Sequence, residues 1–252
     1  MSQEPPRFGQ DLPAWPQADF AAFGEIEVKP LARLRKVAAG YFARNWVMIP
    51  HVTHHDQADV TALEALRRDA AAGGGAKLSP LPYIVKAVAE TLRAYPLFNA
   101  SLELAASNVV YKKYFHIGIA VDTPAGLLVP VVRDCDKKSV TQIAAEIATL
   151  SDKARTKGLP MSDMTGGCFT VSSLGNIGGT GFTPIINAPE VAVLGVCRAT
   201  WAPTRGEDDA VAWRLLLPMS LSYDHRLING ADAARFTRHL AGVLERPEAL
   251  SG

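Results

Sequence analysis

Among the six histidines of this 252-residue chain, His225 lies where a side chain that acts as a base is most easily exposed to another molecule. Before it, apolar residues recur at every second position from Leu215 to Tyr223, which predicts a strand. After it, the spacing from Ala231 to Leu240 predicts a helix. Reactive side chains concentrate on connections that regular structure holds at both ends. An imidazole titrates near neutral pH and can therefore take a proton from an attacking group.

The same segment also has an interpretation that involves no chemistry. Asn229 can cap the following helix, Gly230 can relieve the turn, and Asp232 complements the helix dipole. His225 is then a hydrogen-bonded loop residue, or one held in a salt bridge by Asp224. The local pattern alone does not decide between a base and a structural histidine.

Two adjacent serines, Ser172 and Ser173, follow an apolar run and suggest a covalent serine mechanism. The nucleophile-elbow pattern needs glycine two positions before the nucleophile, and Val171 stands there before Ser173. The elbow interpretation therefore fails. The glycines from Gly175 through Gly181 fit neither dinucleotide-binding nor P-loop spacing, and we interpret them as a close-packed loop at the active site.

One cluster contains residue types that bind metal ions, namely His51, His54, His55 and Asp56. These residues lie on a predicted strand, where successive side chains point to opposite faces, and no second cluster completes a ligand set. We therefore expect no metal site.

The composition indicates a soluble protein of the cytoplasm. Hydrophobic residues make up 48% of the chain, and 26 basic against 25 acidic residues leave no electrostatic footprint for nucleic acid or an anionic membrane. No apolar run approaches the length of a membrane span, and the start does not have the layout of a signal peptide. Cys135, Cys168 and Cys197 are scattered and odd in number, so we expect reduced, buried thiols.

The chain divides into two parts of unequal size. Residues 1–30 contain five prolines among polar residues and predict an extended arm that lies along a surface. Residues 31–252 predict one domain without an internal linker. Met1 begins either a natural stand-alone protein or a fragment.

Helices alternate with strands through this domain. The expected helices span about 31–46, 61–73, 80–95, 139–158 and 231 onward, and capping boxes are expected at Thr61 with Glu64 and at Ser139 with Gln142. The expected strands lie around Val52, on both sides of a turn at 123–126, and over 167–173, 191–200 and 213–223. Helices mixed with partly antiparallel strands predict an α/β fold, in the form of an α+β layered sandwich.

The string from Tyr223 to Phe236 closely resembles the active-site signature of dihydrolipoyl acyltransferases, the core subunits of 2-oxo acid dehydrogenase complexes. It also contains the His-x-x-x-Asp-Gly pattern of chloramphenicol acetyltransferases, with Asn229 where most relatives have Asp. Further similar segments follow in family order at 46–53, 98–101, 116–123, 126–132, 169–175 and 187–196. The resemblance covers nearly the whole chain and is closest to the acetyl-transferring branch from pyruvate dehydrogenase complexes.

This resemblance implies a trimeric, chloramphenicol-acetyltransferase-like fold. It further implies transfer of an acetyl or other acyl group between coenzyme A and the dihydrolipoyl thiol of a lipoyl domain on another domain or chain. In that reaction His225 is the general base, and Ser172 is the hydroxyl donor that stabilises the tetrahedral oxyanion. The role of Asn229 stays open between positioning and helix capping.

The resemblance also implies residues for coenzyme A. Arg67 matches a family arginine near the coenzyme A nucleotide, and a guanidinium group is well suited to bind phosphate. The alternative is a surface arginine that is simply solvated. Asn99 and Ser101 match a segment that lines the same channel.

The resemblance places the active site between subunits, with His225 and Asn229 facing Ser172 of a neighbour. The segment 245–252 contains one leucine and a polar end, so we expect an isolated trimer, or a larger core that forms only weakly. The alternative function is a catalytically weakened structural or regulatory core subunit. Asn229 is the only motif residue that favours this alternative.

Overall fold

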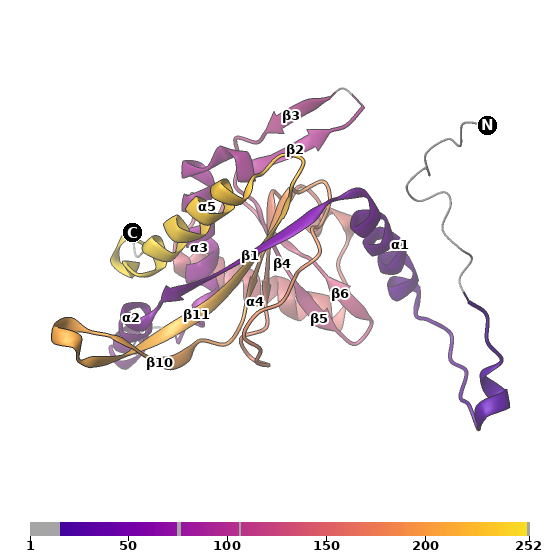
Figure 1. Cartoon of the computed structure of the whole chain (residues 1–252), viewed down its shortest axis with the longest axis horizontal. Coiled ribbons are helices and arrows are strands. Elements are labelled where there is room, and N and C mark those ends of the chain that lie inside the picture. Colours follow the sequence, from indigo (N-terminus) through magenta and orange to yellow (C-terminus); the bar gives the residue numbers. More distant parts are fainter. Residues whose placement is uncertain (1–15, 75–76, 106, 251–252) are drawn as a thin grey trace.

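The computed structural model describes residues 16–74, 77–105 and 107–250 of the chain. A seven-stranded mixed sheet forms its centre (Figure 1). Six strands follow one another across the sheet in the order β1 (His51–Asp59), β11 (Val211–Asp224), β9 (Ala192–Val196), β8 (Phe169–Ser173), β4 (Ile117–Ile119) and β7 (Val131–Val132). The seventh, β10 (Thr200–Arg205), pairs with the first half of β11.

Strands β4, β8 and β9 run parallel to one another, and the other pairs are antiparallel. One face of this sheet forms the main core with four helices: α2 (Thr61–Ala72), α3 (Pro80–Ala94), α4 (Val140–Thr156) and α5 (Gly230–Leu244). The alternation on β11 places Leu217, Met219, Leu221 and Tyr223 in that core, as predicted. The architecture is the layered α/β sandwich expected from the sequence.

The opposite face of the sheet is polar along one row. The register aligns Ser172 on β8 with Gly195 on β9, then with Ser220 on β11 and His55 on β1. Phe182 covers the middle of this row, because a Cβ at Gly195 would lie 2.5 Å from the Phe182 ring. Ser172 at the edge of the row stays half-buried.

Two short hairpins complete the domain. One joins β2 (Ala100–Glu103) to β3 (Asn108–Tyr111), and the other joins β5 (Val121–Thr123) to β6 (Gly126–Leu128). The second hairpin has the turn predicted at 123–126. The first hairpin and the strands β4 and β7 have no separate counterpart in the sequence prediction.

Two sequence predictions are wrong in detail. Helix α2 begins at Thr61, but the Thr61 N–H donates to Asp59 Oδ1 at 2.9 Å, and Glu64 binds Arg67 instead of closing a capping box. The strand predicted over 191–200 ends at Val196, and β10 begins at Thr200. The capping box of Ser139 and Gln142 at the start of α4 is confirmed.

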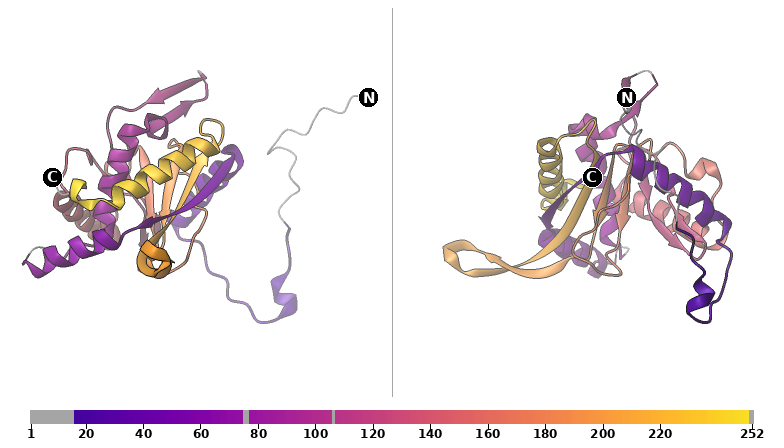
Figure 2. Two further views of the ribbon diagram at one scale, coloured as in Figure 1. Left: turned by 60° about the vertical axis from the view of Figure 1, so that its left-hand side comes forward. Right: turned by 45° about the vertical axis from the view of Figure 1, so that its right-hand side comes forward.

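The N-terminal part leaves the body of the molecule (Figure 2). Residues 16–32 are exposed and extended, apart from a short 3₁₀ turn over Phe20–Phe23, and α1 (Arg33–Met48) buries only Asn45. Exposed large apolar side chains gather here: Phe20, Phe23, Ile26, Val28, Leu31, Val37, Tyr41, Phe42, Trp46, Val47 and Met48. Residues 16–32, the described part of the predicted arm together with the start of the next segment, therefore do not pack along a surface of the described chain. Residues 1–15 of the predicted arm lie outside the described part.

The cysteines are three buried free thiols, as expected. Burial raises the pKa of the Cys135 thiol to about 12, so it stays protonated and unreactive near neutral pH. Among the residues that the structure describes, no helix has the length and apolarity to cross a membrane.

Candidate active site

His225 directly follows β11 and is held by its backbone rather than by its side chain. Its N–H donates to the carbonyl of Pro50 at 3.1 Å, and its exposed ring lies 5.8 Å from the Tyr223 ring centroid. Within the described residues, neither imidazole nitrogen has a hydrogen-bond partner. The backbone is thus fixed while the ring stays free to meet another molecule.

The neighbouring Asp224 does not form a salt bridge with His225. Its buried carboxylate accepts from Arg226 Nε at 2.9 Å and from Arg226 Nη2 at 2.6 Å. The Asp224 carboxylate in turn raises the pKa of the Arg226 guanidinium. The structural alternative for His225, a salt bridge to Asp224, is therefore wrong.

Asn229 is the N-cap residue of α5. Its backbone N–H donates to Asp232 Oδ2 at 3.4 Å, and the residue is exposed four positions after His225. Capping is therefore part of its role. A second role toward a bound molecule stays a prediction.

Ser172 and Ser173 point to opposite sides of β8. Ser173 shares the face of Val171 and lines a cavity on the helix side of the sheet. Ser172 lies on the polar face, where the register aligns it with Gly195 and Ser220. The two serine side chains therefore lie on opposite faces of the sheet.

Ser172 and His225 of one chain are far apart. Ser220, two strands from Ser172, precedes His225 by five residues. At about 3.3 Å per residue and about 4.8 Å per strand, the Cα atoms of the two residues are separated by roughly 19 Å. A base must lie within hydrogen-bond reach of the reacting group, so Ser172 and His225 of the same chain are too far apart to act on one group.

The predicted coenzyme A residues occupy separate places. Arg67 donates to both Glu64 oxygens, at 3.0 and 3.1 Å, and to the carbonyl of Leu78. Asn99 is buried and its Nδ2 donates to the carbonyls of Lys112 and Tyr114. Ser101 donates to the Pro189 carbonyl at 2.6 Å. All three make internal contacts, so their coenzyme A roles stay predictions.

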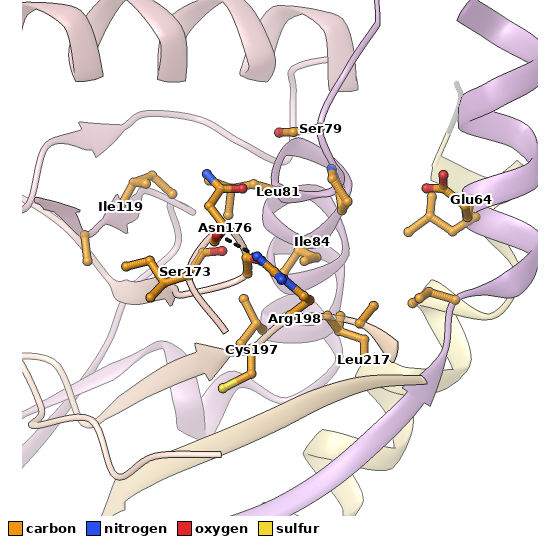
Figure 3. Close-up of a pocket in the computed structure, with 18 of the residues that line it drawn as sticks. Glu64, Ser79, Leu81, Ile84, Ile119, Ser173, Asn176, Cys197, Arg198 and Leu217 are labelled. Carbon is orange, nitrogen blue, oxygen red and sulfur yellow. Dashed lines mark hydrogen bonds between the residues drawn. The ribbon is translucent and has the colours of Figure 1, made fainter. Parts of the chain in front are cut away.

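A cavity of about 730 Å³ opens at the carboxyl ends of β4, β8 and β9 (Figure 3). Its floor is apolar and includes Ile84, Ile119 and Leu217, while Ser173 and Asn176 add polar groups. The carboxyl edge of parallel strands is where open sheets most often bind ligands.

Three arginines from three elements also line this cavity. Arg68 pairs with Glu64, and Arg198 donates to the carbonyls of Gly175 and Asn176. Arg155 on α4 has no partner within the described chain. Together with the N-terminus of α3, they favour an anionic ligand. No local sequence pattern identifies this cluster, because its members lie far apart along the chain.

The candidate metal cluster is used internally. The two His51 ring nitrogens bind the Ile49 carbonyl at 2.7 Å and the Ile186 N–H at 3.0 Å, and His55 binds Ser220 at 2.9 Å. In the described ranges, no group of three or more His, Cys, Asp or Glu side chains could hold a metal ion.

Comparison with known proteins adds an independent line of argument. Residues 23–251 match the family model described as 2-oxoacid dehydrogenases acyltransferase (catalytic domain). Over 239 residues the chain is 54% identical to the dihydrolipoyllysine-residue acetyltransferase component of the pyruvate dehydrogenase complex from Pseudomonas aeruginosa. That alignment covers 94% of this chain and 44% of the relative, so the chain spans less than half the length of that relative.

Solved structures agree. The dihydrolipoamide acetyltransferase of Azotobacter vinelandii has a TM-score of 0.91 at 51% identity, covering 95% of this chain and 99% of that one. A cubic core of a pyruvate dehydrogenase multienzyme complex also has a TM-score of 0.91, at 52% identity, covering 95% of this chain and 99% of that one. A chloramphenicol acetyltransferase shares only the fold, at a TM-score of 0.55 and 15% identity.

The Azotobacter structure comes from a study of a serine, a histidine and an asparagine in the catalytic mechanism. There the asparagine follows the histidine by four positions, as Asn229 follows His225 here, and the serine precedes the histidine by 52. In this chain Ser173 precedes His225 by 52 positions and Ser172 precedes it by 53. Spacing alone therefore does not choose between the serines.

Proposed function

Because the chain belongs to the family of 2-oxo acid dehydrogenase acyltransferases, we propose that it transfers an acetyl group between coenzyme A and the dihydrolipoyl thiol of a lipoyl domain. The observation that carries this proposal is the free, exposed imidazole of His225 on a rigid connection, with Asn229 four residues later. Three free thiols suit a reducing compartment, so we place the reaction in the cytoplasm.

The chemistry is an exchange of one thioester for another. His225 accepts the proton of the attacking thiol as its sulfur adds to the carbonyl carbon, because the thiol is mostly protonated at neutral pH. The new carbon–sulfur bond forms a tetrahedral intermediate, and the old carbon–sulfur bond then breaks. The imidazolium returns its proton to the departing thiolate, so protons and electrons balance.

Negative charge develops on the carbonyl oxygen during this addition, and a serine hydroxyl can donate to it. We assign that role to Ser172 rather than Ser173, because Ser172 lies on the polar face and Ser173 faces the cavity on the helix side. The one-residue difference in spacing fits an insertion in the exposed turn between β10 and β11, which changes no position on β8.

The separation of about 19 Å between Ser172 and His225 requires the half-sites of two chains to meet. We propose a homotrimer in which His225 and Asn229 face Ser172 of the next subunit. The exposed apolar arm and α1 supply surface for such contacts, since large apolar patches mark interaction sites. Leu250 is buried in the core of its own chain, so it is not free to join trimers into a larger core, and we propose that such a core forms only weakly.

For coenzyme A, the arginine-lined cavity offers a place for the phosphates; Glu64, the partner of Arg67, lines it. Arg155 has no internal partner and is free to bind a phosphate, and the apolar floor suits an adenine ring. Ser173 at this cavity and Ser172 on the polar face are consecutive residues of β8, so a ligand in the cavity can reach the reacting centre around the end of that strand.

The test is direct. Incubation of the purified chain with acetyl-coenzyme A and a lipoyl domain that carries dihydrolipoyllysine should yield the S-acetyl lipoyl domain, detected as a mass increase. Absence of the product from correctly assembled protein would contradict the proposal and leave the structural or regulatory core subunit.

A further inference from the structure

Glu190 is a buried acid with no role in the reaction described above. It lies two residues before the start of β9, is 4% exposed, and has one oxygen, Oε2, without a hydrogen-bond partner in the described structure. The other oxygen accepts from Asn187 Nδ2 at 3.4 Å. Burial raises the pKa of the Glu190 carboxyl to about 7, because a buried carboxylate loses its hydration.

The carboxyl contacts the strand that carries Ser172. Thr170 lies two residues before Ser172 on the same face of β8, and its hydroxyl lowers the pKa of Glu190 in part. A Cβ at Gly118 would lie 2.9 Å from Thr170 Oγ1, so Thr170 is closely confined on that side. The Glu190 carboxyl therefore lies against β8 two residues before Ser172.

The residues on either side of Glu190 bind two other parts of the candidate site. The Val191 carbonyl accepts from the Asp224 N–H at 2.8 Å, directly before His225. The Pro189 carbonyl accepts from Ser101 Oγ at 2.6 Å. Glu190 thus lies where the segments of Ser172, His225 and Ser101 meet.

No cation neutralises this carboxyl at ion-pair distance within the described residues. Lys112 faces it, but its Nζ donates to the Ala100 carbonyl at 2.9 Å, and burial lowers the pKa of the Lys112 amine. Cys168 also lies near both groups. A cavity of about 340 Å³ beside Glu190 contains the remaining charged neighbours, Arg44, Asp224 and Arg226. Asp224 and Arg226 pair with each other, and Arg44 binds Asn45.

We propose that Glu190 is a positioning residue that is protonated in the active protein and keeps the strands of Ser172 and His225 in place. This inference rests on the proposed function. The neutral carboxyl shares a hydrogen bond with the Thr170 hydroxyl, and neither Glu190 Oε2 nor Thr170 Oγ1 has another partner in the described structure. Ionisation leaves a buried charge with no cation at ion-pair distance in the described residues, and the cost of burying that charge weakens the packing of the junction.

The direction of the pH effect follows from the raised pKa. Between the ordinary value of 4.5 and about 7, the folded protein holds a proton that the unfolded chain has lost. Stability from this group is therefore complete below pH 4.5 and is lost as the pH rises through 7. The acetyl-transfer rate should decline as the pH rises through 7, where the carboxyl of the folded protein ionises.

Replacement of Glu190 by glutamine tests this inference, because glutamine keeps the shape and a donor but does not titrate. At pH 6 the Glu190→Gln variant should transfer acetyl groups within about twofold of the wild-type rate. Above pH 7 the wild-type rate should fall while the variant shows no decline at that pH. Glu190→Leu should lose at least tenfold in kcat at every pH, with the KM for coenzyme A within twofold of the wild-type value. Glu248→Gln, at an exposed position, is the matched control and should keep the wild-type profile.

Hydrogen–deuterium exchange provides a readout that does not depend on catalysis. At pH 8 the Asp224 amide and the amides of β8 should exchange faster in the wild type than in Glu190→Gln, with no difference at pH 6. Identical exchange in both proteins at both pH values, or an unchanged pH–rate profile in Glu190→Gln, overturns the positioning role. If the wild type transfers no acetyl group, the proposed function fails, and the exchange comparison alone decides the role of Glu190.

Discussion

Mixing two inactive variants tests how the half-sites are divided between chains. His225→Ala removes the base of every chain, and Ser172→Ala removes the hydroxyl donor of every chain. In a ring of three subunits, each site takes its histidine from one chain and its serine from the next. After random exchange at equal amounts, about one site in four combines an intact His225 with an intact Ser172. The expected activity is therefore about a quarter of the wild-type value.

The experiment unfolds the two variants together, refolds them at different ratios, and measures acetyl transfer per mole of chain. Activity should follow the product of the two fractions, with its maximum at equal amounts, and native mass spectrometry of variants with different tags should show hybrid trimers. Separately refolded proteins mixed afterwards serve as the control. If proven hybrids are no more active than the parents, both residues act within one chain, and the separation of about 19 Å does not describe the working site.

Three further outcomes are expected. Ser172→Ala should lose about 10²–10³ in kcat with little change in KM, while Ser173→Ala should stay within about threefold; the reverse order would assign the donor role to Ser173. Arg155→Ala should raise the KM for coenzyme A about tenfold without affecting the lipoyl substrate, whereas Lys157→Ala, at the residue that follows the same helix and outside the cavity, should not; equal effects would show that the phosphate does not bind in this cavity. Phe23→Ser, at a side chain that is 88% exposed, should weaken the trimer about 10- to 100-fold in sedimentation experiments, and an unchanged trimer would show that the arm is not an interface.

The fold was predictable where short-range signals act alone. The capping box of Ser139 and Gln142 forms both of its reciprocal hydrogen bonds at the start of α4, as the local pattern predicts. At Thr61 the same pattern fails, because Asp59 on β1 reaches the helix start first and the Leu215 N–H donates to the threonine hydroxyl. That competition comes from the sheet and cannot be seen in a local pattern.

The strand predicted over 191–200 shows a second limit. Every residue of β9 is buried, whereas β10 alternates between exposed and partly buried positions. The change at Val196 occurs because β9 is flanked by β8 and β11, while β10 pairs only with β11 and forms the sheet edge. Apolar content alone did not reveal this change of neighbours.

The candidate site shows the same difference between residues that a local pattern predicts and residues that depend on long-range packing. His225 and Asn229 belong to one short segment, so the sequence could predict both together, whereas the proposal that Ser172 acts from another chain depends on the register of the strands. Arg155 and Glu190 carried no such signal. Their roles depend on a cavity and on a buried junction that form only when distant segments pack together.

Acetyl transfer by the wild-type protein and by folded His225→Ala tests the central claim most directly. The assay follows acetyl-coenzyme A and a dihydrolipoyl domain, with circular dichroism and sedimentation confirming the same fold and assembly for both proteins. Loss of a general base should lower kcat by about 10²–10⁴, while the KM values stay close to those of the wild type. Near-normal turnover by His225→Ala would contradict the account, because the exposed imidazole would then not be the base.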